Sequence, residues 1–260
     1  MNWLYIRWNV SPEILELGPL HIRWYGLLFA SGFLVGFYIM RWIYKKEKKA
    51  EQSLDALLWY LLVGTIVGAR LGHCLFYEPA YYLANPIEIL KIWEGGLASH
   101  GGTIGVFLAL YLYAKNHPDQ PFVWLTDRLT LPTALTAALI RIGNLFNSEI
   151  YGKITAVPWA FIFERVDPHP RHPTQLYEAI VYAVLFIQLL YLYRKGWYAT
   201  QAHGRPLGLF LTWVFGWRWV IEWWKEPQEA FSLPLPLNMG QLLSLPFIVV
   251  GLYLLFAKNK

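Results

Sequence analysis

The chain has 260 residues, of which 56% are hydrophobic and only 15% are charged. Soluble domains carry about 25% charged residues, so this composition predicts an integral membrane protein and excludes an ordinary soluble domain. The net charge of +5 does not indicate nucleic acid binding, because a phosphate-binding patch gathers on one soluble face and no long polar segment is present to carry one.

Seven apolar stretches qualify, or nearly qualify, as membrane spans, since a helix needs about 20 mostly apolar residues to cross the hydrocarbon core. The N-terminus lacks the charged-then-apolar layout of a cleavable signal peptide, so the first stretch is expected to be a retained span. The third and sixth stretches contain glycines and charges and are less clear. The stretches are Leu20–Tyr44, Leu54–Tyr77, Gly96–Lys115, Phe122–Asn147, Thr174–Tyr193, Pro206–Trp224 and Leu237–Ala257. The sequence therefore predicts an all-α membrane protein, a bundle of seven transmembrane helices.

The lysines and arginines in the connections indicate the orientation of this bundle. With the N-terminus outside, twelve of them face the cytoplasm and six face the other side, which favours an outer N-terminus and a cytoplasmic C-terminus. Of the 22 lysines and arginines, 22 − 12 − 6 leaves four inside or at the ends of spans. These four are Arg23, Arg70, Arg141 and Arg218.

Two outer connections are long enough to form structure of their own, residues 78–95 and 148–173. The second contains "VPWAFIFE", an apolar and aromatic run that predicts a strand or hairpin leg. No internal repeat is visible. The simplest domain organisation is a single integral membrane domain over residues 1–260, with residues 148–173 as a small extracytoplasmic cap.

The four arginines need an explanation, because a charge at the bilayer centre costs about 2.5 to 3.5 kcal/mol even on lenient scales. For Arg23 the favoured interpretation is that the side chain reaches the membrane interface. For Arg70 this interpretation and a position inside the protein are equally favoured. An interface position suits Arg141 and Arg218 poorly. A salt bridge between Arg218 and Glu222, four residues apart on one helix face, is one alternative. The other is that the guanidiniums of Arg141 and Arg218 converge on an anionic ligand such as a phosphate.

The segment "RIGNLFNSEIYG" combines Arg141 with polar residues at the end of an apolar run. Asn144 shares a helix face with Arg141, and Asn147 continues that face if the helix persists. Glu149 and Gly152 follow where the helix should stop. A polar group in this position predicts a binding site at the membrane surface.

Three further positions could carry chemistry. His100 in "GGLASHGGTIG" is either a base or, more commonly, a hydrogen-bonded packing residue. Tyr25 in "RWYG" is either an aromatic belt residue or a hydroxyl donor to a headgroup. Glu178 in "RHPTQLYEA" needs a partner inside the bundle. The remaining histidines show no metal-binding spacing, and the single cysteine, Cys74, excludes a thiolate metal site, so neither a metal nor a cofactor is expected.

Six segments, in the order "RWYG", "SHGGTIG", "RIGNLFNSEIYG", "RHPTQLYEA", "RWVIEWWKEP" and "LNMGQLLSLP", together resemble the prolipoprotein diacylglyceryl transferase family. The resemblance covers nearly the whole chain. It implies a seven-helix, multi-pass protein of the bacterial cytoplasmic membrane with its N-terminus outside. It also implies transfer of the diacylglyceryl group of phosphatidylglycerol to the lipobox cysteine thiol of a preprolipoprotein, which leaves a thioether and glycerol-1-phosphate.

The resemblance also implies roles for individual residues. It gives catalytic roles to Arg141, Arg218, His100 and Tyr25, and substrate binding to Arg141, Asn144, Asn147, Glu149, Gly152 and Glu222. Two positions depart from the family pattern. Lys225 stands where the family usually has a second arginine, and Gln228 where it usually has an aspartate. Lysine keeps the charge but loses the planar fork.

Three other functions are compatible with a polar bundle. A transporter or channel for an anionic solute would also place arginines in a cavity, but such folds are built from repeats. A retinal pigment needs a lysine inside a span, and the lysines here lie at loops or ends. A structural membrane subunit would leave two arginines and "SHGGTIG" without a purpose.

Overall fold

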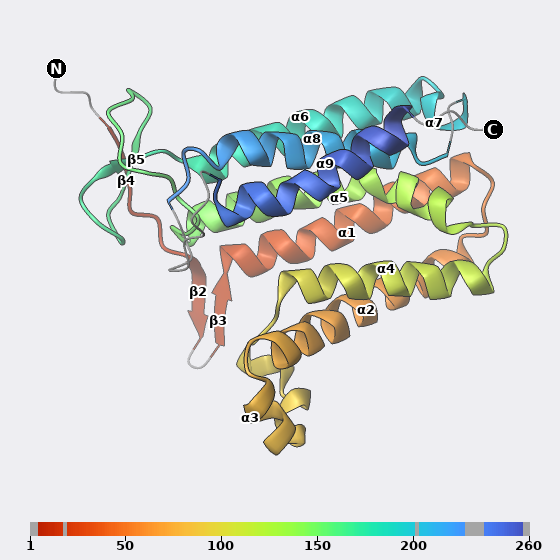
Figure 1. The fold of residues 1–260 in the computed structure, drawn as a ribbon, viewed down its shortest axis with the longest axis horizontal. Helices are drawn as coiled ribbons and strands as arrows, with labels where there is room; N and C mark the ends of the chain where they lie inside the picture. Colours follow the sequence, from red (N-terminus) through yellow and green to blue (C-terminus); the bar gives the residue numbers. More distant parts are fainter. Residues whose placement is uncertain (1–4, 18–19, 201–202, 227–236, 257–260) are drawn as a thin grey trace. The chain divides into compact units, whose positions relative to one another are not determined.

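The computed structural model describes residues 5–17, 20–200, 203–226 and 237–256, and they form two compact units. Unit 1 comprises Met1–Ile39 and Asp127–Lys260, and unit 2 comprises Met40–Thr126. The unit boundaries fall within helices α1 (Trp24–Lys46) and α5 (Phe122–Phe146), both of which are labelled in Figure 1. The two units therefore share continuous helices.

Five helices are long and apolar enough to cross a membrane, which confirms a mostly helical membrane protein. They are α1, α2 (Gln52–Phe76), α5, α6 (Thr174–Arg194) and α9 (Met239–Phe256). The third and sixth predicted stretches are also helical, as α4 (Ser99–Asn116) and α8 (Arg205–Ile221). However, α8 has only 17 residues, and α4 has polar residues at both ends. Seven spans thus remain a prediction.

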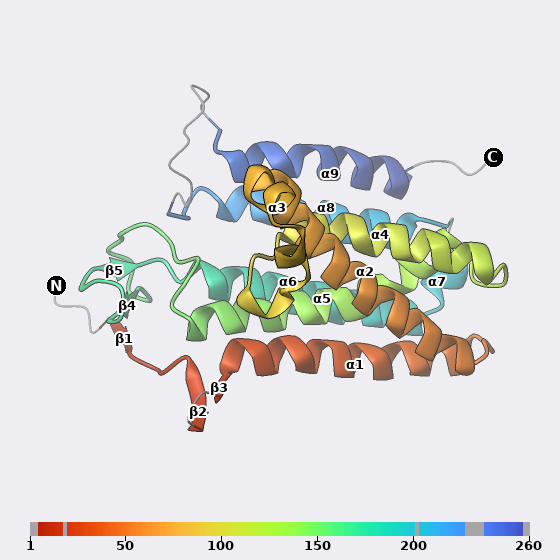
Figure 2. The same ribbon diagram turned by 90° about the horizontal axis from the view of Figure 1, so that it is seen from below.

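The helices of unit 1 pack through small residues. Helix α8 packs against α6 and α9 (Figure 2). A Cβ added to Gly208 of α8 would lie 2.7 Å from the carbonyl oxygen of Gly251 in α9. One added to Gly32 of α1 would lie 2.7 Å from Thr136 Cγ2 in α5. Such positions let helix backbones approach closely where no hydrophobic effect drives association in lipid.

A small sheet forms the cap of unit 1. Strand β1 (Ile6–Trp8) pairs in parallel with β4 (Phe161–Phe163), which pairs antiparallel with β5 (Pro170–Arg171). The strand predicted in "VPWAFIFE" is therefore confirmed as β4. Phe161 and Phe163 pack on Leu145 near the end of α5, so the cap has its own apolar core. The contribution of the N-terminal strand to this sheet was not predicted.

The first span was predicted to start at Leu20, which is wrong, because residues 20–23 form a strand. Strands β2 (Glu13–Leu17) and β3 (Leu20–Arg23) form a hairpin, and α1 begins only at Trp24. Glu13 lies opposite Arg23, and their side chains lie 3.5 Å apart. An ion pair across the hairpin thus favours pairing of residues whose hydropathy alone suggested a helix.

Unit 2 is built on the contact between α2 and α4. A Cβ on Gly101 would lie 2.7 Å from Gly72 Cα, and one on Gly64 would lie 2.7 Å from Ala109 Cβ. Beyond the end of α2, helix α3 (Pro79–Ala84) and the short 3-10 helices η1 (Pro86–Leu90) and η2 (Ile92–Glu94) form the connection to α4. This connection leads into α4, whose second residue is His100.

Candidate active site

The end of helix α5 folds back on itself. Ser148 and Ile150 have φ values of 53° and 57°, a left-handed conformation that is costly outside glycine. The turn brings the Glu149 N–H to the carbonyl oxygen of Asn144 at 3.1 Å. It also brings Glu149 Oε1 to Asn144 Nδ2 at 2.7 Å and Asn147 Nδ2 at 3.1 Å. Two amides thus hold one carboxylate just beyond the helix end.

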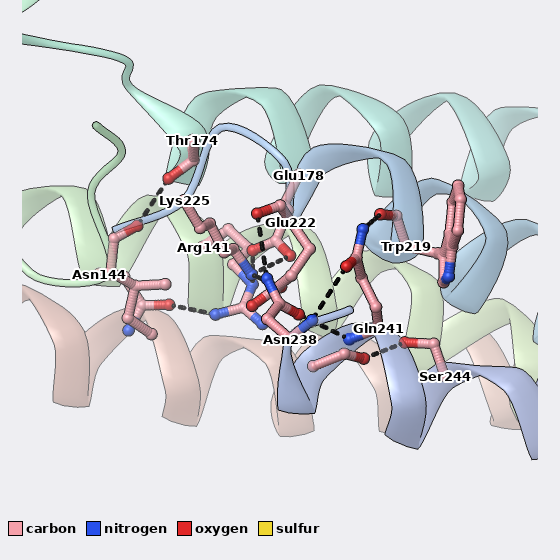
Figure 3. A network of polar contacts seen from close by, with 12 residues as sticks. Arg141, Asn144, Thr174, Glu178, Trp219, Glu222, Lys225, Asn238, Gln241 and Ser244 are labelled. Carbon is pink, nitrogen blue, oxygen red and sulfur yellow. Dashed lines mark hydrogen bonds and ion pairs between the residues drawn. The ribbon is translucent and has the colours of Figure 1, made fainter. Parts of the chain in front are cut away.

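Arg141 continues this chain of contacts toward the interior of unit 1 (Figure 3). One of its terminal nitrogens donates to Asn144 Oδ1 at 3.0 Å, and its Nε lies 2.7 Å from Glu178 Oε2 in α6. The Tyr182 hydroxyl also interacts with Arg141. A guanidinium has five N–H groups, and these contacts account for three of them among the residues that the structure describes. The Arg141 guanidinium is therefore held in one orientation, while the described residues use only part of its hydrogen-bonding capacity.

Glu178 is the centre of a buried ion cluster. Its side chain is 0% exposed, and its Oε1 accepts from Lys225 Nζ at 2.8 Å. Lys225 Nζ also lies 3.4 Å from Glu222 Oε2 (Figure 3). The predicted partner of Glu178 is thus confirmed and is in fact two cations. Two cations and two carboxylates make this cluster neutral, which suits a site where an unpaired charge is expensive.

The salt bridge between Arg218 and Glu222, one of the two alternatives, is not formed among the described residues. Helix α8 ends at Ile221, and the next turn brings Lys225 back to Glu222. Among the described residues Arg218 has no ion-pair partner, and its charge acts on Tyr182, the residue that also contacts Arg141. Lys225 therefore replaces Arg218 as the partner of Glu222, and the convergence of Arg141 and Arg218 on a ligand stays a prediction.

Tyr25 and Gly152 join the same region. Tyr25 is half-buried, and a Cβ on Gly143 would lie 2.9 Å from its ring. The charges of Arg141 and Glu149 both act on its hydroxyl. A Cβ on Gly152 would lie 2.5 Å from the carbonyl oxygen of Trp224. Close backbone packing therefore explains the glycine at 152.

Two further residues were missed as parts of the site. Thr174 and Gln175, both 0% exposed, open helix α6. Thr174 Oγ1 donates to the carbonyl oxygen of Ile150 at 2.8 Å, and Gln175 Nε2 donates to that of Glu149 at 2.6 Å. They satisfy the carbonyls of the strained turn. Their position in the first turn of an apolar helix was the available signal.

The segment "LNMGQLLSLP" fixes the start of α9 beside the ion cluster. Asn238 and Gln241 exchange two hydrogen bonds of 2.9 and 3.1 Å, in the manner of a capping box. Gln241 Nε2 also donates to the carbonyl oxygen of Trp219 at 3.3 Å (Figure 3). A Cβ on Gly240 would lie 2.5 Å from the Glu222 carboxyl carbon. This motif therefore positions Glu222.

Arg171 ties the cap to this region. It donates to Asp167 Oδ2 through Nε at 2.9 Å and a terminal nitrogen at 2.6 Å. It also donates to the carbonyl oxygen of Gly152 at 3.2 Å. The hydrogen bond from Arg171 holds the pKa of Asp167 below its usual value, and the same bond raises the pKa of Arg171. Burial lowers the pKa of the neighbouring His172.

A polar cavity of about 580 Å³ opens beside Glu149. Asn147 and Glu149 form one part of its wall, so the carboxylate that Asn144 holds faces this space. The rest of the wall comes from residues in or near the β2–β3 hairpin and from the cap. The other lining residues are Asn9, Ser11, Pro12, Glu13, Arg23 and Arg165.

Two sequence predictions fall outside this assembly. His100 lies in unit 2, exposed at the second position of α4, with its ring 5.7 Å from that of Phe76 and 5.9 Å from that of Tyr77. It is not among the residues that unit 1 brings together. Gln228 lies outside the described residues.

Comparison with known proteins decides the family. The model of the prolipoprotein diacylglyceryl transferase family matches residues 12–257. The chain belongs to this family. It is 51% identical over 256 residues to a protein of Chloroherpeton thalassium named phosphatidylglycerol--prolipoprotein diacylglyceryl transferase, with 98% of this chain and 95% of the relative covered.

Other members of the transferase family are similarly close. A protein of the same name from Tolumonas auensis is 52% identical over 255 residues, covering 97% of this chain and 98% of the relative. One from Porphyromonas gingivalis is 46% identical over 270 residues, covering 98% and 95%. Relatedness extends over the whole chain, so the network around Arg141 belongs to a transferase scaffold.

Proposed function

We propose that this chain transfers the sn-1,2-diacylglyceryl group of phosphatidylglycerol to the lipobox cysteine thiol of preprolipoproteins, the first step of bacterial lipoprotein maturation. The observation that carries the proposal is identity of about one half, over nearly the full length, to relatives named for this reaction. The buried polar network at the end of α5 supports it, because it offers guanidinium donors to a phosphodiester.

The proposed setting is the bacterial cytoplasmic membrane, with the chain as a single multi-pass domain. In this arrangement α4 and α8 join the five apolar helices to make seven spans, the N-terminus lies outside, and the C-terminus lies in the cytoplasm. The excess of lysines and arginines in the connections assigned to the cytoplasm supports this orientation. Residues 148–173 then form a small outer cap, and the ion cluster lies near the outer surface.

The reaction breaks the bond between a glyceryl carbon and a phosphate oxygen. The sulfur of the lipobox cysteine forms a bond to that carbon, the thiol loses its proton, and the electron pair leaves with the phosphate as glycerol-1-phosphate. Negative charge therefore grows on the phosphate. Arg141, with free N–H groups, and Arg218, with no ion pair among the described residues, are the proposed catalytic cations, because fixed donors stabilise charge best in a dry site.

The thiol must lose its proton before or during the attack. A thiol of pKa about 8.5 is mostly protonated at neutral pH. His100, whose imidazole is exposed, is the proposed base. A positive field from the two arginines is the alternative, and it needs no base. A pH profile separates these two possibilities.

The remaining predicted residues bind and orient the substrate in this proposal. Asn144 directs Arg141, and Glu149 with Asn147 accepts the headgroup hydroxyls at the edge of the polar cavity. Tyr25 donates its hydroxyl to the phosphate. Glu222 and Gly152 act indirectly, since Glu222 balances Lys225 and Gly152 allows the turn to pack against Trp224.

The test uses the purified full chain in detergent with phosphatidylglycerol and a lipobox peptide, with mass spectrometry of the peptide. Wild type should add a diacylglyceryl mass, and Arg141→Ala and Arg218→Ala should lose most of this activity. Arg41→Gln is the matched control, because Arg41 is an exposed arginine paired with Glu51. A wild-type protein that binds phosphatidylglycerol but leaves the peptide unmodified would overturn the proposal and make anion transport the hypothesis to test.

A further inference from the structure

Arg70 is a buried arginine that the reaction described above does not use. It lies near the end of α2 with only 4% of its surface exposed. Among the side chains that the structure describes, no carboxylate lies within ion-pair distance of it. The guanidinium is therefore enclosed by protein, and its charge must be stabilised there.

Four backbone carbonyls from the connection to α4 surround the Arg70 guanidinium. Its Nε donates to the oxygen of Ile89 at 2.9 Å, and one terminal nitrogen donates to that of Glu88 at 2.5 Å. The other terminal nitrogen donates to the oxygens of Gly95 at 2.6 Å and Gly96 at 3.3 Å. The guanidinium also lies 5.1 Å from the centre of the Tyr82 ring. Only a planar fork with five donors can serve carbonyls on both sides in this way.

The same contacts fix the backbone on the N-terminal side of His100. Gly95 and Gly96 have φ values of 91° and 67°, so the chain turns sharply there, and Arg70 binds the carbonyl of each. A Cβ on Gly96 would lie 2.7 Å from the Arg70 nitrogen. Two residues later, the Ala98 N–H donates to the carbonyl oxygen of Ala69 at 2.9 Å. Consecutive residues of α2 thus hold this turn.

On the C-terminal side, Gly101 lies against α2 with no space for a side chain, since a Cβ there would lie 2.7 Å from Gly72 Cα. His100 is therefore held on both sides while its own side chain stays exposed between the rings of Phe76 and Tyr77. An exposed imidazole on a rigid backbone suits a group that must meet a second molecule in one geometry.

We propose that Arg70 is a positioning residue, which holds the 88–96 connection so that His100 is presented in one orientation. The proposal rests on the role of His100 in the proposed function. It predicts that loss of the guanidinium fork lowers kcat at neutral pH by about tenfold or more, because a displacement of about 1 Å costs up to about a hundredfold. It also predicts little change in KM for phosphatidylglycerol, since the hydrogen bonds of Arg70 go to the backbone of the 88–96 connection.

The test compares full-length wild type, Arg70→Gln, Arg70→Lys, His100→Ala and the control Arg41→Gln between pH 6 and 9.5. At high pH the substrate thiol, of pKa about 8.5, ionises without a base. The deficits of Arg70→Gln and Arg70→Lys should therefore shrink with rising pH in parallel with that of His100→Ala. Hydrogen exchange of amides 88–98 should be about tenfold faster in both Arg70 variants.

The possible results separate this inference from the proposed function. If His100→Ala recovers at high pH but the Arg70 variants do not, Arg70 only stabilises the fold and the inference fails, while the transferase proposal stands. If His100→Ala keeps full activity at pH 7, neither residue acts through a base and the inference also fails. Should Arg70→Gln not fold, Gly96→Ala displaces the guanidinium while keeping its charge, and it should give the same pH profile.

Discussion

Replacing Glu178 with glutamine should destabilise the protein, because the carboxylate of this residue pairs with both Arg141 and Lys225. The substitution keeps the shape of the side chain and removes its charge. The cluster of Arg141, Lys225, Glu178 and Glu222 then changes from neutral to a charge of +1. The side chains of Glu178, Lys225 and Arg141 are 0%, 6% and 16% exposed, so water can compensate little of this change.

The size of the loss in unfolding free energy depends on the contacts that Arg141 and Lys225 keep. Removing one partner of a buried ion pair costs about 3 to 5 kcal/mol. Arg141 keeps its contacts with Asn144 and Tyr182, and Lys225 keeps Glu222 at 3.4 Å. The lower limit, about 3 kcal/mol of unfolding free energy, is therefore expected. Glu178→Gln combined with Lys225→Met restores neutrality and should recover more than half of this loss.

Denaturant unfolding in detergent, followed by tryptophan fluorescence, measures these differences. Glu51→Gln is a matched control, because Glu51 also lies beside an arginine Nε, at 2.8 Å, and a lysine Nζ, at 3.7 Å, but is 40% exposed. It should leave the unfolding midpoint unchanged. A Glu178→Gln protein as stable as wild type, or a double variant whose loss equals the sum of the single losses, would refute the reasoning.

Three further predictions concern the cap and the turn after α5. Gly152→Ala should lower the free energy of unfolding by about 1 to 3 kcal/mol, the range for overpacking, since its Cβ would lie 2.5 Å from the Trp224 carbonyl oxygen. Gly216→Ala is the control, because a Cβ there would meet nothing within 4 Å, and it should be neutral or stabilising in the same unfolding assay. Asn144→Ala should lower the free energy of unfolding by about 1 to 3 kcal/mol, because the Glu149 carboxylate loses a buried hydrogen-bond donor. It should also lower kcat/KM in the peptide assay more than the control Asn116→Ala, which removes an exposed hydrogen bond to Tyr60. Because the folded pKa of Asp167 is depressed, its stabilisation is fully present above the unfolded pKa of about 3.9 and is lost as the pH falls through the lower folded value. His172, also depressed, should cause an earlier loss as the pH falls below about 6.5. Hydrogen exchange of residues 160–172 against pH should show both steps in wild type and only the acid step in His172→Asn, and a single step in wild type would contradict this assignment.

Periodicity and hydropathy predicted most of the helical architecture because long apolar runs have few alternatives in lipid. They failed where a short segment is decided by its partner. Leu20–Arg23 precedes an apolar run and was included in the first span, but it pairs as β3 with the hairpin strand that carries Glu13. The N-terminal strand β1 likewise became visible only through its pairing with β4, more than 150 residues later. Pairing over such a separation leaves no local pattern in the sequence.

Of the contacts near the end of α5, the sequence predicted one and missed others. The spacing of Arg141 and Asn144 on one helix face correctly implied that they interact. The i, i+4 spacing of Arg218 and Glu222 implied a second pair as one alternative, yet Lys225, three residues beyond Glu222, lies at its carboxylate instead. Helical spacing places two side chains on one face, but it does not decide which cation a carboxylate on that face pairs with. The Ser148 and Ile150 turn, which closes Glu149 onto Asn144, depends on left-handed residues that sequence does not reveal.

Arg70 and Arg141 show two solutions to the burial of an arginine, and the difference bears on function. Arg141 is balanced by a carboxylate, so its charge is neutralised before substrate arrives, and its free N–H groups supply directed hydrogen bonds rather than net charge. Arg70 is solvated by carbonyl dipoles and keeps its positive charge, but all sides of its fork are used by the backbone. Arg218 differs from both, since no described residue forms an ion pair with it. In the proposed function, the incoming phosphodiester acts as the counter-ion of Arg218 while Arg141 directs it, and charge that moves onto the departing phosphate strengthens both contacts.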